Sequence, residues 1–159
     1  TYKIYDALFG LEEGVITPEN SFIAWNGETY PFEAWNADQT LQSAMNSSVN
    51  WYFESVDEQL GAANISNYIQ EIGYGNENMN GDFSTYWMES SLKISPIEQV
   101  ELLTKLHNNS FEFSPENINA VKDAILLSSS DAGSYSGTTT SSSGCSSSGA
   151  PCGESSLLF

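Results

Sequence analysis

The strongest constraint on the fold is a series of segments with helical spacing of apolar residues, which ends abruptly at Ser128. Apolar side chains recur three and four residues apart in segments 2–13, 49–60 and 65–72. Such a helix is stable when its apolar stripe packs against another element. The residues before Ser128 therefore predict a packed, mainly helical unit, and Gly14 is the expected end of the first helix.

Helix-start signals add three further helices to this prediction. Ser95-Pro96-Ile97-Glu98 has the form of a capping box with proline at the first helical position, and predicts a helix through Leu106. Ser114-Pro115 predicts a helix through Leu127. Asp38 is expected to cap a shorter helix through Met45.

The charge balance excludes several kinds of partner. The 159 residues include 21 Asp and Glu against four Lys and no Arg, which gives a formal net charge of −17. Such a charge repels nucleic acid and anionic lipid surfaces, so we expect neither as a partner. A solvated acidic surface explains the composition. No apolar run approaches the ~20 residues of a membrane span.

The cysteines and the single histidine do not indicate a metal site or a histidine-based triad. Cys145 and Cys152 have no second Cys/His pair, whereas a zinc site needs about four such ligands. A disulfide between them remains possible. His107 lies near the end of a predicted helix, where a solvent-facing position is favoured over a Ser-His-Asp triad.

Three short motifs and one tryptophan carry the chemistry of the chain. Thr1-Tyr2-Lys3 opens the first helix, Ser48-Val49-Asn50 precedes the helix of segment 49–60, and Tyr74-Gly75-Asn76 begins a Gly/Asn-rich loop before Trp87. In this order, over roughly residues 1 to 135, they resemble the active-site elements of penicillin-recognising serine proteins. The resemblance is to class D β-lactamases and to the sensor domains of β-lactam-responsive signal transducers.

The resemblance implies an α+β fold of the β-lactamase and transpeptidase type, of which this chain would supply mostly the helical region. We expect residues 1–133 to form that helical part and residues 134–159 a Ser/Gly-rich segment, either a flexible tail or a degenerate β-hairpin. Missing strands of its own domain, or another chain, would cover the exposed apolar face. In the family pattern Ser-x-x-Lys, the nucleophilic serine would be the residue before Thr1.

The resemblance also implies a role for each motif residue. Lys3 and Ser48 would be catalytic, Lys3 as a general base carbamylated by carbon dioxide and Ser48 as a proton relay. Trp87 would steady the lysine carbamate through its indole N–H. Substrate-binding residues would be Asn50, Tyr74, Asn76 and Thr139. No metal or other cofactor is implied.

Physical chemistry supports these roles but also offers simpler explanations. Apolar and aromatic neighbours of Lys3 would lower its pKa, as a neutral base requires, although a lysine at a helix start is often exposed. Ser47 or Ser48 could be an ordinary N-cap, and Trp87 an ordinary core residue. Asn50 departs from class D enzymes, many of which have a hydrophobic residue there, and is closer to the sensors.

The last family motif, Lys-Thr-Gly, is incomplete in this chain. Gly137-Thr138-Thr139-Thr140 stands in its place, so Thr138 occupies the position of the lysine. If the segment is a hairpin, Gly137, Gly144, Gly149 and Gly153 should lie at turns or close approaches. The strand around Thr138 and Thr139 should then run beside the helix that carries Lys3.

Three functions are compatible with the sequence. The favoured one is a class D β-lactamase that acylates its serine with a β-lactam and hydrolyses the ester. The alternatives are an extracytoplasmic β-lactam sensor, which is acylated but not turned over, and an inactive remnant. The resemblance implies an extracytoplasmic location for all three, with β-lactams as ligands. The oligomeric state and the preferred antibiotic are left open.

Overall fold

The computed structural model describes residues 2–83, 85–88, 91–130 and 133–136. Thr1, Thr138, Thr139, the glycines from Gly137 onward and both cysteines lie outside these residues. The predictions about residues 137–159 therefore concern a part of the chain that the structure does not describe.

Helices are the main regular structure of the described chain, as predicted. Their bounds are α1 (Tyr2–Glu12), the 3₁₀ helix η1 (Glu33–Trp35), α2 (Leu41–Asn46), α3 (Asn50–Leu60), α4 (Ala62–Ile72), α5 (Pro96–His107) and α6 (Pro115–Ile125). A two-stranded antiparallel hairpin follows, β1 (Leu126–Ser130) and β2 (Gly133–Ser136), with Ser128 opposite Tyr135 and Ser130 opposite Gly133. No described helix has the length and apolar character needed to cross a membrane.

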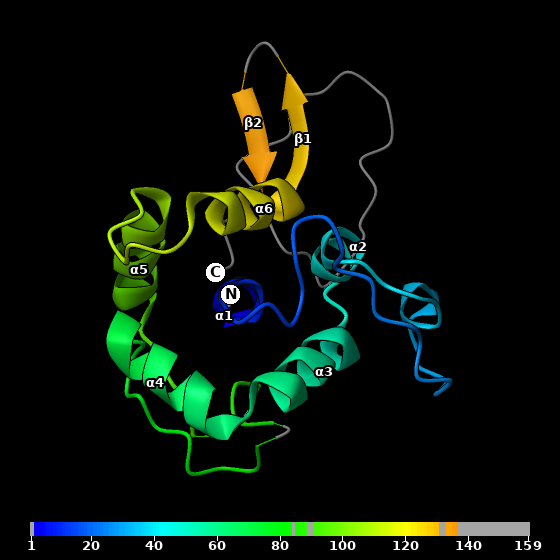
Figure 1. Ribbon diagram of the computed structural model, residues 1–159, viewed down its shortest axis with the longest axis horizontal. Coiled ribbons are helices and arrows are strands. Elements are labelled where there is room, and N and C mark those ends of the chain that lie inside the picture. The colour runs from blue at the N-terminus through cyan, green and yellow to red at the C-terminus, as the bar shows by residue number, and fades with distance from the viewer. Residues whose placement is uncertain (1, 84, 89–90, 131–132, 137–159) are drawn as a thin grey trace.

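Helix α1 is the centre of the core. Figure 1 shows it end-on, with α2 to α6 arranged around it. It packs against α3, α4 and α6, and every residue from Tyr2 to Leu11 is buried. Gly10 allows a close approach to α3, because a Cβ there would lie 2.6 Å from a methyl group of Val56. Since α1 has no solvent face, its polar residues Lys3 and Asp6 are buried as well.

The predicted start of α5 is confirmed. Ser95 Oγ accepts from the Glu98 amide at 3.3 Å, and Glu98 Oε2 accepts from the Ser95 amide at 2.9 Å. Pro96 occupies the first helical position, where no amide proton is required. His107 is the last residue of this helix and is exposed, as expected.

Two predicted helix boundaries are wrong. Helix α2 is capped by Thr40, which exchanges hydrogen bonds with Ser43, and not by Asp38. Asp38 instead accepts from the Trp25 amide at 2.9 Å, beside the bridge that pairs Ile23 with Gln39. The helix expected to reach Leu127 ends at Ile125, and a strand begins at Leu126. The serines that follow compete for backbone hydrogen bonds and so disfavour further helix.

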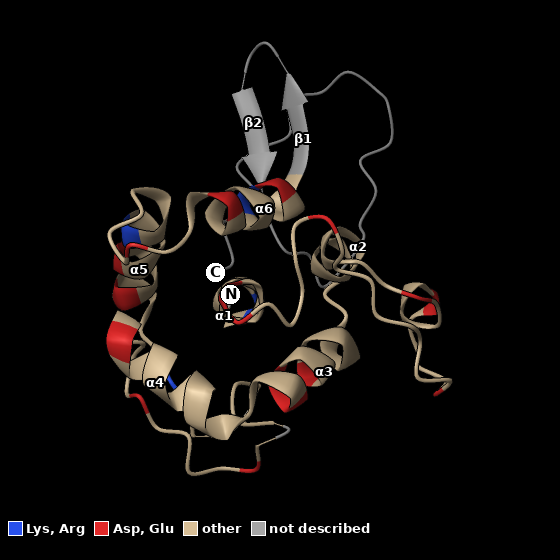
Figure 2. Ribbon diagram, in the orientation of Figure 1, with Lys and Arg blue, Asp and Glu red and all other residues tan. Residues whose placement is uncertain are grey.

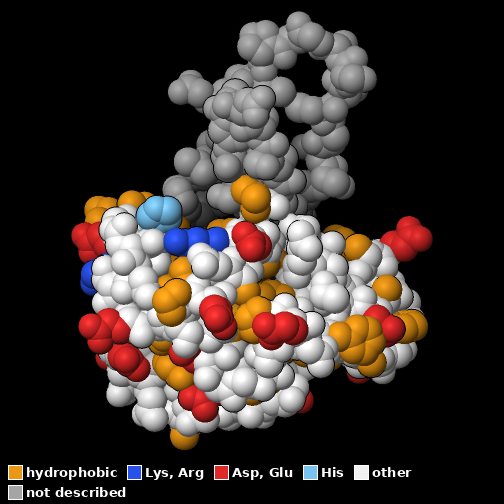
Figure 3. Space-filling model, turned by 45° about the horizontal axis from the view of Figure 1, so that its top comes forward, with side chains coloured by type: hydrophobic (Ala, Val, Ile, Leu, Met, Phe, Trp, Pro, Cys, Tyr) orange, Lys and Arg blue, Asp and Glu red, His pale blue; other side chains and the backbone are white. Residues whose placement is uncertain are grey.

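Acidic residues occur on α3, α4, α5 and α6 and on the segment that contains η1 (Figure 2). On the face shown in Figure 3 they are interspersed with hydrophobic and uncharged side chains, and basic residues are few. This distribution fits a solvated acidic surface.

We predict that Ser95→Ala lowers the free energy of unfolding by about 1 kcal/mol, because the Glu98 amide loses its acceptor. Ser114→Ala is the matched control, since Ser114 stands at the N-cap of α6 but makes no side-chain cap hydrogen bond. Urea denaturation of both variants measures the difference. Equal losses in the two variants would contradict this account of the cap.

Candidate functional site

The structure brings Lys3, Ser48 and Trp87 together around the lysine amine. Lys3 Nζ donates to the Ser48 carbonyl at 2.8 Å and lies 5.5 Å from the centre of a Trp87 ring. The Phe53 ring is 5.8 Å from the same ammonium group. Lys3 is only 9% exposed, so the alternative of an ordinary surface lysine is wrong. Three segments far apart in the chain thus meet at this amine.

Opposing effects act on the charge of Lys3. Burial lowers its pKa from 10.5 to about 8, while the negative charges of Glu54 and Asp6 raise it. Burial is the larger effect because the aromatic walls offer no solvation to an ammonium group. A lysine with a pKa of about 8 has a neutral fraction near physiological pH, which a general base requires.

Ser48 has an unusual backbone conformation. Its φ of 51° is in the left-handed region, which non-glycine residues seldom adopt. The N-cap of α3 is Val49, so the interpretation of Ser47 or Ser48 as that cap is wrong. The same residue accepts the hydrogen bond from the Lys3 amine through its backbone carbonyl. Strained backbone of this kind is common at functional sites.

Asn50, the first residue of α3, is half-buried between that helix and the segment that bears Trp87. Its Nδ2 donates to the Met88 sulfur at 3.2 Å. Asn50 therefore lies at the same junction as Lys3 and Trp87, although its amide bonds the neighbouring Met88.

Tyr74 and Asn76 are placed mainly by contacts within the protein. The Tyr74 ring meets those of Tyr2 and Tyr5 edge-on at 5.5 and 5.4 Å, and Tyr74 is 3% exposed. The exposed Asn76 donates through Nδ2 to the Ser91 carbonyl at 2.8 Å and accepts from the Lys93 amide at 2.9 Å. These bonds fasten the 73–81 loop to residues 91–93. The two residues hold the wall of the site in place, and their predicted contact with a substrate stays a prediction.

Trp87 is half-buried and stacks on Tyr2, with ring centres 5.8 Å apart. Its Nε1 is buried and makes no hydrogen bond to the described residues. The indole is close enough to the Asp57 carboxyl to lower the pKa of that group. A buried indole N–H usually has an acceptor, and the interaction with the Asp57 carboxyl is the one that the described residues offer.

The sequence analysis missed a buried polar cluster next to Lys3, formed by Asp6, Asp57, Tyr86 and Tyr2. Asp6 and Asp57 are 0% and 2% exposed. Burial raises the pKa of both carboxyls, that of Asp57 to about 6. A sequence signal was present, because Asp57 lies four residues after Phe53 and three before Leu60, on the apolar stripe of its helix.

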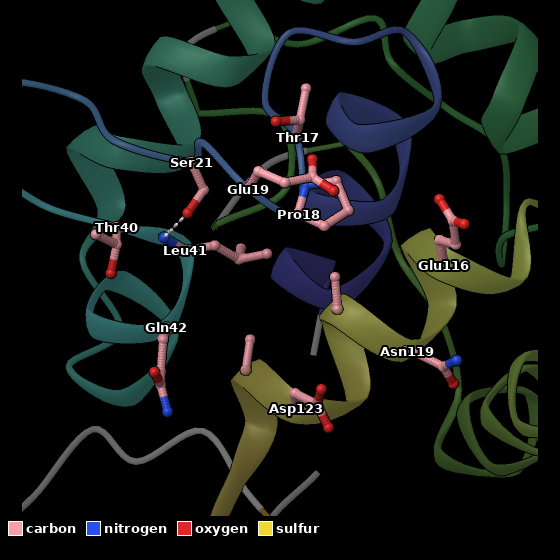
Figure 4. A pocket seen from close by; sticks show the side chains of 12 residues that line it. Thr17, Pro18, Glu19, Ser21, Thr40, Leu41, Gln42, Glu116, Asn119 and Asp123 are labelled. Atoms are coloured by element: carbon pink, nitrogen blue, oxygen red, sulfur yellow. Dashed lines mark hydrogen bonds between the residues drawn. The ribbon is translucent and has the colours of Figure 1, made fainter.

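A separate open cavity of about 590 Å³ lies between the 17–21 loop, α2 and α6. Figure 4 shows acidic and hydroxyl side chains around it, with Ser21 Oγ accepting from the Leu41 amide at 3.0 Å. Among the described residues, none of those expected to act in catalysis or substrate binding lines this cavity.

Comparison with known proteins identifies the fold of this chain. The C-terminal domain of the Bacillus licheniformis BlaR penicillin-receptor superposes with a TM-score of 0.79 at 46% identity, over 82% of this chain and 53% of that chain. The probable β-lactamase YbxI of Bacillus subtilis (strain 168) is 34% identical over 131 residues, which are 82% of this chain and 49% of YbxI. The predicted β-lactamase/transpeptidase-like fold is thereby confirmed.

The family is equally clear. The model of the penicillin-binding protein transpeptidase domain matches residues 1–147, and the chain belongs to that family. The regulatory protein BlaR1 of Bacillus licheniformis is 46% identical over 142 residues, which are 87% of this chain and 23% of BlaR1. The chain thus spans about a quarter of that relative and about half of YbxI.

The close packing at Gly75 gives a test of the loop that walls the site. A Cβ at Gly75 would lie 2.0 Å from the Lys93 carbonyl oxygen, at a φ of +54°. We predict that Gly75→Ala lowers the free energy of unfolding by about 2–4 kcal/mol. Gly27→Ala is the control, because Gly27 also has a positive φ but open space around it, and should lose about 1 kcal/mol. Thermal and urea unfolding distinguish the two, and equal losses would contradict the packing argument.

Proposed function

We propose that this chain forms the lysine-bearing part of a β-lactam-reactive site, in which a serine directly before Thr1 is acylated by the antibiotic. The observation that carries the proposal is the burial of Lys3 between aromatic rings, with its amine on the Ser48 carbonyl. In the family's Ser-x-x-Lys pattern, the serine lies one helical turn from this amine. Neutral Lys3 can then take the serine proton as the ring opens.

We favour a sensor, in which the acyl-serine persists, over a hydrolase. Asn50 places a polar amide at the edge of the pocket, bonded to Met88. Similarity to the penicillin-receptor BlaR is also higher than similarity to YbxI, at 46% against 34% identity. A receptor requires fast acylation and slow release of the adduct.

A class D β-lactamase is the second candidate, and one observation favours it. The buried Nε1 of Trp87 lies beside Lys3 and makes no close hydrogen bond to the described residues, apart from a weak interaction with the Asp57 carboxyl. An oxygen of a lysine carbamate would satisfy this donor, so the residues present fit the group. Lys3 would carry the carbamate and Trp87 would hold it. When present, the carbamate supplies a base that can activate the water for deacylation.

We place the protein outside the cytoplasm by analogy with its relatives, with β-lactams as its small-molecule ligands. The acidic surface offers no basic patch for nucleic acid among the described residues (Figure 2).

The role of Lys3 is tested by acylation. In a protein with serine directly before Thr1, fluorescent penicillin should label the chain covalently, and Lys3→Met should slow labelling by about 100-fold or more. Lys105→Met is the control, since Lys105 is exposed on α5 and should label normally. Equal labelling of the Lys3→Met protein would contradict the proposal, and an unlabelled parent protein would indicate an inactive remnant.

Sensor and hydrolase are separated by the lifetime of the adduct. We expect mass spectrometry to show one stoichiometric acyl group that persists, with no further consumption of a chromogenic β-lactam. Many turnovers per site, increased by added bicarbonate, would instead establish the carbamate-dependent enzyme.

A further inference from the structure

A buried polar cluster lies directly beside the lysine pocket and is not used by the mechanism above. The Tyr86 hydroxyl donates to both carboxylate oxygens of Asp57 at 3.3 Å. The Tyr2 and Tyr86 hydroxyls are hydrogen-bonded to each other, so Tyr2 donates to Tyr86 when Tyr86 donates to Asp57. This chain of hydroxyls ends on a carboxyl that is only 2% exposed.

The Asp6 carboxyl faces Asp57 across the α1–α3 contact. Asp6 is fully buried, and neither of its oxygens receives a hydrogen bond from a donor of the described residues. Two buried carboxylates cannot both remain ionised at contact distance, because like charges repel strongly where water is excluded. Burial and the neighbouring Asp57 raise the pKa of Asp6, and a hydrogen bond from Asp6 favours the ionised form of Asp57.

Lys3 and Asp6 are three residues apart on α1 and therefore share one face of the helix. Burial lowers the pKa of Lys3, while the negative charge of Glu54 on α3 and, to a smaller extent, that of Asp6 raise it. The other titratable neighbours are Tyr2, Tyr52 and Tyr86, whose pKa values are all raised by burial. These tyrosines are uncharged at neutral pH, so the nearby carboxyls supply the opposing charge.

We propose that Asp6 and Asp57 share a single proton, and that the one negative charge left on the pair holds Lys3 in its ammonium form. The two acids are then positioning residues that act through Lys3. This inference rests on the proposed function, because it assigns a purpose to the protonation state of that lysine. An ammonium group can neither accept the serine proton nor combine with carbon dioxide. The pair would thus set the pH above which the pocket becomes reactive.

Direct titration of Lys3 tests the proposal without any antibiotic. The chain has four lysines and no arginine, so ¹³C-lysine labelling gives few NMR signals, and Lys3→Met identifies the one from Lys3. We expect Asp6→Asn/Asp57→Asn to lower the titration midpoint of Lys3 by about one pH unit. Asp6→Asn alone should change it little, because the single negative charge then remains on Asp57.

Two control variants calibrate the measurement. Glu54→Gln should also lower the midpoint, since it removes the other negative charge that favours the ammonium form. Asp123→Asn, on the exposed side of α6, should leave it unchanged. An unchanged midpoint in the folded double variant would overturn the proposal. If the double variant does not fold, ¹³C-aspartate NMR of the parent protein decides, and two ionised carboxyls at Asp6 and Asp57 near neutral pH would overturn the proposal.

A second readout connects the pair to function. In the protein with serine before Thr1, the pH for half-maximal acylation by penicillin should fall in the double variant by the same amount as the lysine midpoint. A fall in the lysine midpoint without a change in the acylation profile would overturn the functional part of the inference. If the parent protein is never acylated, the proposed function fails, and the NMR titration alone decides whether the pair exists.

Discussion

The complete burial of α1 is the physical constraint on which the site depends. A helix without a solvent face needs apolar residues all round, and α1 has them at nearly every position. The exceptions, Lys3 and Asp6, must then be desolvated, so each needs a partner or a shifted pKa. Lys3 has both, since its amine bonds the Ser48 carbonyl and burial lowers its pKa to about 8. The reactivity of the amine follows from packing that the rest of the helical unit provides.

The same packing explains why elements far apart in sequence share one pocket. The left-handed turn at Ser48 and the junction of Asn50 with Met88 lie at the start of α3, which packs directly on α1. Trp87 reaches the pocket by stacking on Tyr2, and Tyr74 anchors its loop on the same ring. Tyr2 therefore organises two walls of the site, although it has no chemical role in the proposed reaction.

Local sequence patterns predicted the helices well but did not predict the charged groups buried at the site. The capping box at Ser95 and the apolar spacing in α1, α3 and α4 depend on residues within one or two turns, so the sequence shows them directly. The choice of Thr40 over Asp38 as a cap depends on a bridge between Ile23 and Gln39, which is a tertiary contact. The pairing of Asp6 with Asp57 depends on how α1 packs on α3. No local pattern contains that relation, even though Asp57 interrupts an apolar stripe.

In the proposed mechanism, a β-lactam receptor and a hydrolase differ in whether the Lys3 amine is protonated. Burial favours the neutral amine of Lys3, and nearby acids favour its ammonium form. Trp87 offers a donor that suits a carbamate, while a persistent ammonium group prevents that carbamate from forming. Small changes in the acids around the lysine can therefore shift the outcome between turnover and a lasting adduct, with the aromatic pocket left intact. In the proposed mechanism, the same fold and the same lysine would serve either function.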